Sequence, residues 1–500
     1  MSIKKNAFIN YAGQGWIALV GIVFVPIYLK HLGIANYGLI GIYTVLQTWV
    51  SLLDLGITPT ITREMAKLQS GEHIPQSIRN LIFTFETLIY TISTCVLLIL
   101  LLSSDLISDL WINSEDASNL PLVEAIQVAS FVVASRFCEG IYRGGLIGLE
   151  KHYALNKVQV FFSTLKFGGA AILVSFHPSI VLFFTWQALV SICNVIYLRK
   201  IFYRYIPKGH AVPVIDFSAI SKIKNFAGGM TITNLIALVF TQSDKFIVSF
   251  YCSLESFGAY MLAFTITGIL PMLIYPIVAT ISPKLNVATS LKNESNELFL
   301  FNTGNQIATL IATPIFAVCF FFGYQVIFSW TNDPFVASIS GNLLSMLVIG
   351  IYCNALMLIP FSLQQAHGWT TLSIASNLIG LLILIPTAYT AVNVYGATGV
   401  AFSWALSNLV ILFIATIKMH QKLLCGELKP FFKRIILKPF LISSLVAIPI
   451  NFYFSNLGQN RWLTFFGVLL YIFISALLIL ATLPIKNEML KLIKNKNIGK

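Results

Sequence analysis

Long apolar stretches recur along the whole chain, and they constrain its fold more than any other feature. A helix of about 20 apolar residues is long enough to cross a bilayer core of about 30 Å. Spanning β-strands would be shorter and would alternate in polarity, so these stretches predict helices. We identify fourteen spans, at residues 8–29, 38–60, 81–103, 121–142, 154–176, 179–198, 226–250, 258–282, 300–329, 338–360, 370–391, 397–417, 435–455 and 462–483. The sequence therefore predicts an all-α polytopic membrane protein with about 14 transmembrane helices.

The composition argues against a soluble protein. Of the 500 residues, 57% are hydrophobic and only 10% are charged, and the mean hydropathy is +0.82. Soluble proteins carry about 25% charged residues. The first apolar stretch has no small-residue cleavage site, so we expect it to stay as the first span and not to be removed as a signal peptide.

The distribution of lysine and arginine predicts the orientation of the chain in the membrane. If the N-terminus is cytoplasmic, 27 of the 32 Lys and Arg residues fall in cytoplasmic segments, and only Lys30 and Arg461 fall in outer loops. This asymmetry follows the positive-inside rule, so we expect both termini in the cytoplasm. It also explains the net charge of +13 without nucleic acid as a partner.

The loops and motifs exclude most classes of enzyme. No loop is longer than about 30 residues, which leaves no room for a soluble catalytic or nucleotide-binding domain. We find no phosphate-binding, zinc-protease or nucleophile-elbow motif in its required context. The seven cysteines form no CxxC pair, and most lie in apolar segments. The sequence therefore predicts no catalytic residue, no metal site and no cofactor.

A weak internal repeat predicts two similar halves. With a shift of 220 residues, KHLGIANYGLIGIYTVL at 30–46 aligns with FYCSLESFGAYMLAFTI at 250–266. Two sets of six spans in the same orientation make a parallel repeat, and transporters built this way bind substrate near the midplane between the halves. We expect a six-helix bundle at 1–200, a basic cytoplasmic linker at 201–224, a second six-helix bundle at 225–420, two additional transmembrane helices at 430–485 and a basic cytoplasmic tail at 486–500.

Three segments resemble a known family of exporters. SDKFIVSFYCSLESFGAYMLAFTI is similar to the seventh and eighth helices of the multidrug/oligosaccharidyl-lipid/polysaccharide (MOP) exporter superfamily. The N-terminal KNAFINYAGQGWIALVGIVFVPIYLKHLG and the loop GLIGLEKHYALNK look like its polysaccharide branch, the Wzx-type O-antigen flippases. The resemblance covers about residues 5 to 425. Many members of that branch have twelve spans, so fourteen spans leave a neighbouring subfamily such as the lipid II flippases open.

The resemblance implies a fold, a substrate and a location. The two bundles would be arranged as in MATE transporters, in a bacterial inner membrane. The protein would move an undecaprenyl-pyrophosphate-linked oligosaccharide from the cytoplasmic to the outer leaflet by alternating access. Its partners would be that lipid-linked substrate, the bilayer, and a polysaccharide polymerase with chain-length proteins. The alternatives are a lipid II flippase, a membrane polymerase or ligase, and a multidrug or cation antiporter, against which the deep Lys166 argues.

Charged residues inside the spans are the candidate functional residues. Each costs about 2.5 to 3.5 kcal/mol at a helix centre, so it is usually paired or faces a cavity. The cations Arg136, Lys166 and Lys245 form a rough ladder through the membrane and would neutralise a pyrophosphate headgroup. The carboxylates that would line the cavity or couple transport to an ion are Asp54, Glu86, Glu139 and Asp244.

Simpler interpretations of these charges stay open. Arg136 and Glu139 are three residues apart on one helix and would pair with each other. Lys245 lies near enough to the outer interface for its ammonium group to snorkel into water. Asp54 and Glu86 would be packing or interface carboxylates.

The arrangement of the adjacent charges and the energy source are also open at this point. Neighbouring residues on a helix point about 100° apart, so we expect Asp244 and Lys245 not to face each other.

Outward movement of a headgroup with about two negative charges gains about 2.3 kcal/mol per charge per 100 mV. Either this potential or an exchange of protons or sodium through Asp54, Glu86 or Asp244 would drive transport.

Overall fold

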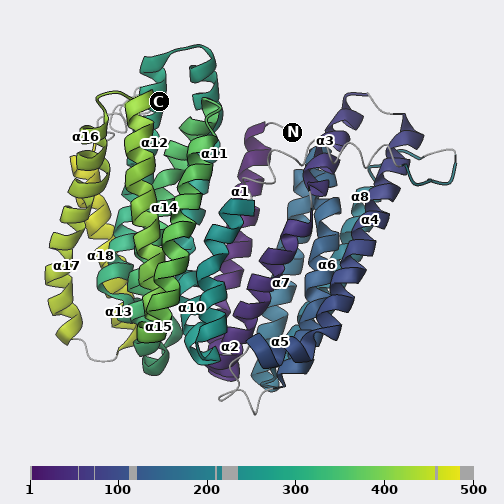
Figure 1. The fold of residues 1–500 in the computed structure, drawn as a ribbon, viewed down its shortest axis with the longest axis horizontal. Coiled ribbons are helices and arrows are strands. Elements are labelled where there is room, and N and C mark those ends of the chain that lie inside the picture. Colours follow the sequence, from purple (N-terminus) through teal and green to yellow (C-terminus); the bar gives the residue numbers. More distant parts are fainter. Residues whose placement is uncertain are drawn as a thin grey trace, which may run out of the picture. The chain divides into compact units, whose positions relative to one another are not determined.

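A computed structural model describes residues 3–54, 56–71, 74–111, 121–208, 211–216, 235–456 and 460–484, and of residues 3–12, 110–111 and 456 only the backbone. The described residues form helices and connecting segments, with no strand among them (Figure 1). Nine of these helices are long and apolar enough to cross a membrane, or ten if a pair bent by 46° near residue 24 is one span. The predicted all-α membrane fold is therefore confirmed, while the count of fourteen spans stays a prediction.

The chain divides into two compact units, residues 1–242 with 253–258 and residues 243–252 with 259–500. The boundary falls inside the helical segment 235–251. The first unit contains α1 (Ile3–Val23), α2 (Val25–Val50), η1 (Ser51–Asp54), α3 (Ile57–Gln69), α4 (Pro75–Leu102), α5 (Ser104–Trp111), α6 (Leu122–Gly148), α7 (His152–Phe176) and α8 (Ile180–Tyr203). Within it α6 is central, because α3, α4 and α8 all pack against it (Figure 1).

The second unit contains most of α10 (Leu254–Thr267) and all later helices. They are α11 (Ile269–Ser290), α12 (Glu294–Phe321), α13 (Gly323–Thr331), α14 (Pro334–Ala366), α15 (Thr371–Leu423), α16 (Leu428–Phe431), η2 (Phe432–Leu437), α17 (Lys438–Asn456) and α18 (Arg461–Thr482). The two last helices pack on each other and on α12 (Figure 1). Arg461 fixes the start of α18, because its guanidinium donates to the carbonyl oxygens of Ser329 and Trp330 at the end of α13, at 3.0 and 3.1 Å.

Glycine breaks long helices where the sequence predicts a change of span. Gly33 in α2 has φ 79° and lies between the first two predicted spans. Gly396 in α15 has φ 56° and lies between the predicted spans 370–391 and 397–417. Glycine has no Cβ, so it adopts these positive φ values without the steric cost that other residues meet.

The predicted span 38–60 is wrong as a single helix. The helix ends at Val50, and η1 and Gly56, with φ 82°, lead into the separate helix α3. The predicted span 300–329 is likewise divided, because α12 ends at Phe321 and α13 begins at Gly323. Apolar content indicates where a chain is buried but does not reveal such local breaks.

Two glycines hold α3 close against α6. A Cβ on Gly144 would lie 2.8 Å from the carbonyl oxygen of Thr58, and one on Gly148 would lie 2.2 Å from that of Thr62. The Thr62 hydroxyl also donates to the Gly144 carbonyl oxygen at 3.0 Å. Small residues permit such close packing of helices in membranes. This contact fixes the face that α6 turns toward the functional site.

Parts of the predicted organisation lie outside the described residues. They include residues 209–210 and 217–224 of the predicted linker, residues 226–234 of the seventh span, residues 457–459 in the region of the two additional helices and the basic tail 486–500. The two six-helix bundles, the two additional helices, the repeat and the orientation of the termini stay predictions.

Candidate functional site

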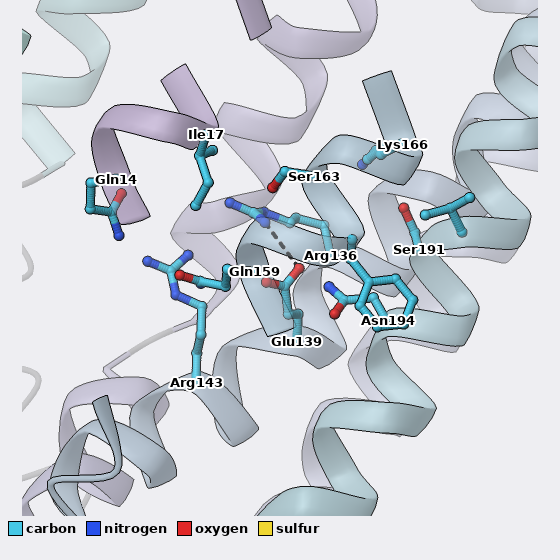
Figure 2. A pocket seen from close by; sticks show the side chains of 12 residues that line it. Gln14, Ile17, Arg136, Glu139, Arg143, Gln159, Ser163, Lys166, Ser191 and Asn194 are labelled. Carbon is cyan, nitrogen blue, oxygen red and sulfur yellow. Dashed lines mark hydrogen bonds and ion pairs between the residues drawn. The ribbon is translucent and has the colours of Figure 1, made fainter. Parts of the chain in front are cut away.

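Three charged residues on one face of α6 form the centre of the candidate site. Arg136, Glu139 and Arg143 are spaced by three and four residues, so their side chains follow one side of the helix. Arg136 Nη1 lies 2.9 Å from Glu139 Oε2 and forms an ion pair (Figure 2). The alternative that these two residues pair is therefore confirmed, and the pair faces a cavity.

A polar cavity of about 170 Å³ lies among α1, α6, α7 and α8, and we call it the polar cavity (Figure 2). Lys166 on α7 faces it together with the three charged residues of α6. The other residues that line it are mainly amides and hydroxyls: Gln14, Ile17, Gln159, Phe162, Ser163, Val190, Ser191 and Asn194. Gln159, Ser163 and Lys166 recur at helical spacing, which places them on one face of α7.

A second cavity of about 440 Å³ shares Arg136, Glu139 and Arg143 with the first, and we call it the wide cavity. It also reaches Gln47 on α2, Asp54 in η1 and the start of α3. The polar cavity and the wide cavity therefore meet at these three residues. A charged group bound at them would lie at the boundary between the two cavities.

The cations of the polar cavity outnumber its carboxylates. Arg136, Arg143 and Lys166 stand against the single carboxylate Glu139, which leaves a formal charge of +2. The Glu139 carboxylate already forms an ion pair with Arg136. In the part of the chain that the structure describes, the side chains of Arg143 and Lys166 have neither an ion pair nor a hydrogen bond. We call Arg143 and Lys166 the free cations.

Asp54 lines the wide cavity, and it also caps α3. Its Oδ1 accepts hydrogen bonds from the Thr58 backbone N–H at 3.1 Å and from the Thr58 hydroxyl at 2.8 Å. A carboxylate at a helix N-terminus satisfies free N–H groups there and interacts favourably with the helix dipole. This contact explains the residue structurally, and a role of Asp54 in ion coupling stays a prediction.

Glu86 lies outside both cavities, at a buried junction of α4, α6 and α8. It accepts hydrogen bonds from the Tyr142 hydroxyl at 2.7 Å, from Arg199 Nε at 3.1 Å and from the Tyr203 hydroxyl at 2.9 Å. Only 4% of Glu86 is exposed. A buried carboxylate with several donors around it ties the three helices together.

The expectation that Asp244 and Lys245 do not face each other is wrong. Lys245 Nζ lies 3.1 Å from Asp244 Oδ1, because the long lysine side chain folds back along its own helix. The Tyr260 hydroxyl donates to Asp244 Oδ2 at 2.6 Å. The ammonium also lies 3.8 Å from the ring centroid of Phe264 and 5.5 Å from that of Trp404.

This pair is enclosed in the second unit. Only 2% of Lys245 and none of Asp244 is exposed, so the ammonium does not snorkel to an interface. An ammonium against aromatic faces is a cation–π arrangement. Lys245 lines neither cavity described above, and its predicted contact with substrate stays a prediction.

Sequence reasoning missed Arg143, Gln159 and Asn194. Arg143 stands one residue beyond the predicted span 121–142, although it lies one helical turn after Glu139 on the same face. That spacing of four residues was the signal available in the sequence. The amide oxygen of Asn194 is buried without a hydrogen-bond partner among the described residues, which no sequence pattern reveals.

The chain is similar in sequence to known proteins. A family model described as polysaccharide biosynthesis protein matches residues 3–288. A protein of Shigella flexneri named "Putative O-antigen transporter" is 23% identical over 414 residues, which are 81% of this chain and 95% of that protein.

Solved structures share the fold at low sequence identity. A structure titled as the lipid II flippase MurJ in an inward closed conformation aligns with a TM-score of 0.72 and 13% identity, over 96% of this chain and 100% of that one. An inward-facing MATE family multidrug transporter of the MOP superfamily aligns with a TM-score of 0.65 and 13% identity, over 85% and 99%. A MOP superfamily transporter from Pyrococcus furiosus aligns with a TM-score of 0.56 and 15% identity, over 85% and 95%.

Proposed function

Because the chain belongs to the polysaccharide biosynthesis protein family, we propose that it is a flippase for a lipid-linked oligosaccharide in the bacterial inner membrane. The proposed substrate is an O-antigen or similar surface-polysaccharide repeat unit on undecaprenyl pyrophosphate, moved from the cytoplasmic to the outer leaflet. The relative named "Putative O-antigen transporter" supports this substrate class and a role other than catalysis.

The observation that carries the proposal is the pair of free cations at the polar cavity. A charge without a partner is costly inside a membrane, so a cavity that holds two of them suits an anionic ligand. A pyrophosphate diester brings about two negative charges and several acceptor oxygens. Arg143 would grip phosphate oxygens with its planar fork, and Lys166 would act as a point charge.

The size of the polar cavity supports a headgroup and not a whole sugar chain as its ligand. A cavity of about 170 Å³ has room for several water molecules. This is suitable for a pyrophosphate group, while an oligosaccharide needs more room. We propose that the sugars enter the wide cavity, which shares the three charged residues of α6, and that the lipid tail stays in the bilayer.

The Arg136–Glu139 ion pair would make binding reversible. In the empty cavity Glu139 neutralises Arg136 at 2.9 Å. Bound phosphate oxygens would compete with Glu139 for the guanidinium, and the carboxylate would take its partner back when the substrate leaves. A transporter needs this, because a site that binds too tightly does not release its substrate.

We propose alternating access as the transport cycle and the membrane potential as a sufficient energy source. Outward movement of about two negative charges gains about 2.3 kcal/mol per charge per 100 mV. Coupling to protons or sodium through Asp54, Glu86 or Asp244 is the alternative. Transport that persists after the proton and sodium gradients are collapsed, with the potential kept, would support the first.

The test is a deletion in the native host followed by extraction of lipid-linked sugars. We expect surface polysaccharide to be lost and intact undecaprenyl-linked repeat units to accumulate, and we expect plasmid-borne wild-type protein to reverse both effects. Surface polymer at the normal level together with changed drug tolerance would refute the flippase and favour the antiporter. Accumulation of lipid II instead of the repeat unit would favour a lipid II flippase.

A further inference from the structure

A polar ladder on α4 holds the segment that follows α8. The side chains of Gln76, Asn80 and Thr84 are four residues apart and therefore lie on one face of α4. They accept hydrogen bonds from three backbone N–H groups further along the chain. These bonds run from Ala211 to Gln76 Oε1 at 3.1 Å, from Val214 to Asn80 Oδ1 at 3.2 Å and from Asp216 to Thr84 Oγ1 at 2.8 Å.

Residues 211–216, which we call the strap, run along α4 in the same direction as the helix. From Gln76 to Thr84 the helix rises about 12 Å, and five extended residues easily span that distance. Thr84 lies inside the apolar run of α4 that begins at Leu81, in a helix long and apolar enough to cross a membrane. The strap therefore extends past the polar start of α4.

The ladder provides hydrogen-bond acceptors for backbone N–H groups of the extended strap. Backbone N–H groups need a partner where water is scarce, which normally restricts membrane segments to helices and closed barrels. Gln76, Asn80 and Thr84 supply such partners for three of the six strap residues. Pro213 has no N–H group to satisfy.

The outward side of the strap is apolar, and the chain leading to it is basic. Val212 is 83% exposed, Val214 58% and Ile215 47%. Exposed cations precede the strap, namely Lys200, Arg204 and Lys208. Apolar side chains beside a cluster of cations match the boundary between acyl chains and anionic lipid headgroups.

We propose that the strap is a lipid-binding element that lies in the membrane interface along α4. Its valine and isoleucine side chains insert among the lipids, and the preceding cations contact anionic headgroups. The ladder on α4 sets the depth and direction of the segment. This inference does not depend on the transported substrate.

Hydrogen exchange on the full chain in lipid nanodiscs tests the ladder. Thr84→Val removes the acceptor for Asp216 N–H, and we expect that amide to exchange about fivefold faster, the effect of one lost hydrogen bond. Thr91→Val is the matched control, because Thr91 bonds its own helix as Thr84 does but does not contact the strap. Asn80→Leu is a second variant and should accelerate exchange at Val214. Equal exchange in Thr84→Val and Thr91→Val would overturn the ladder.

Fluorescence quenching tests the contact with lipid. The exposed cysteines 95, 193 and 425 are replaced by alanine, and a bimane label is placed on Val214→Cys or on Lys208→Cys. In vesicles of phosphatidylglycerol with brominated phosphatidylcholine, we expect strong quenching at 214 and weak quenching at 208. Iodide in the water should give the reverse order. Iodide quenching at 214 equal to that at 208 would place the strap in water and overturn the proposal.

Discussion

Loss of the Lys166 ammonium should weaken headgroup binding without unfolding the protein. Lys166→Gln keeps a polar side chain at the polar cavity, one atom shorter than lysine, and removes the positive charge. Since this ammonium has no partner among the described residues, no carboxylate is left unpaired by the change. The substitution should therefore lower ligand affinity and should not lower thermal stability.

The expected magnitude follows from one charge-assisted hydrogen bond. Such a bond contributes about 1.5 to 3 kcal/mol, which corresponds to about a 10- to 150-fold change in Kd. Titration calorimetry with farnesyl pyrophosphate in detergent measures this directly. Added salt should narrow the difference in Kd between the variant and the wild type, because ions screen the attraction between charges.

A matched control lies on the same helix. Lys157 is exposed on α7 and lines neither cavity, so Lys157→Gln removes the same charge without the proposed contact. We expect its Kd to stay within about twofold of the wild type. Glu139→Gln should change affinity in the opposite direction, because it releases Arg136 for the ligand. Equal Kd values for Lys166→Gln and Lys157→Gln would refute the reasoning.

Three further predictions concern stability and are measured by thermal unfolding in detergent. Asp244→Ala strands a buried ammonium and should cost about 3 to 5 kcal/mol, whereas Asp244→Leu combined with Lys245→Met should recover most of it; equal losses would contradict this. Gly148→Ala should lower the unfolding temperature, since its Cβ would lie 2.2 Å from a carbonyl oxygen, while Gly15→Ala, with open space around it, should not. Glu86→Ala should destabilise the first unit by about 1 to 3 kcal/mol, because it removes the acceptor of the Tyr142 and Tyr203 hydroxyls, while the half-exposed Arg199 can turn to solvent; an unchanged unfolding temperature would show that the junction contributes nothing.

The helical membrane fold could be predicted because apolar length is a property of each segment alone. The family match shows the polysaccharide biosynthesis protein family, and structures titled as MOP superfamily transporters share the fold. Local breaks were harder to predict. The Asp54 carboxylate accepts a hydrogen bond from the Thr58 hydroxyl at the start of α3, inside a stretch that is predicted as one span. A capping bond of this kind changes the course of the backbone without changing the mean hydropathy, so the hydropathy pattern does not reveal it.

The candidate site was predicted only in part, since periodicity indicates which face a residue occupies but not what that face meets. Arg136, Glu139 and Lys166 were identified as buried charges, and they line one cavity. Arg143 was missed because it stands near the end of its apolar stretch. Glu86 was placed among cavity carboxylates, although its donors come from two other helices, which is a tertiary fact.

The adjacency of Asp244 and Lys245 has a consequence for how the protein is made. Each charge alone would hinder insertion of its segment by about 2.5 to 3.5 kcal/mol. Of the groups around the pair, Tyr260 follows in the next helix, whereas Trp404 is synthesised far later. Because the Lys245 side chain folds back on Asp244, the two charges neutralise each other within one segment. This pairing does not have to wait until Trp404 has been synthesised. Moving the two charges apart along the chain would therefore impair the insertion of the nascent helix into the bilayer, before it affects the packing of the finished protein.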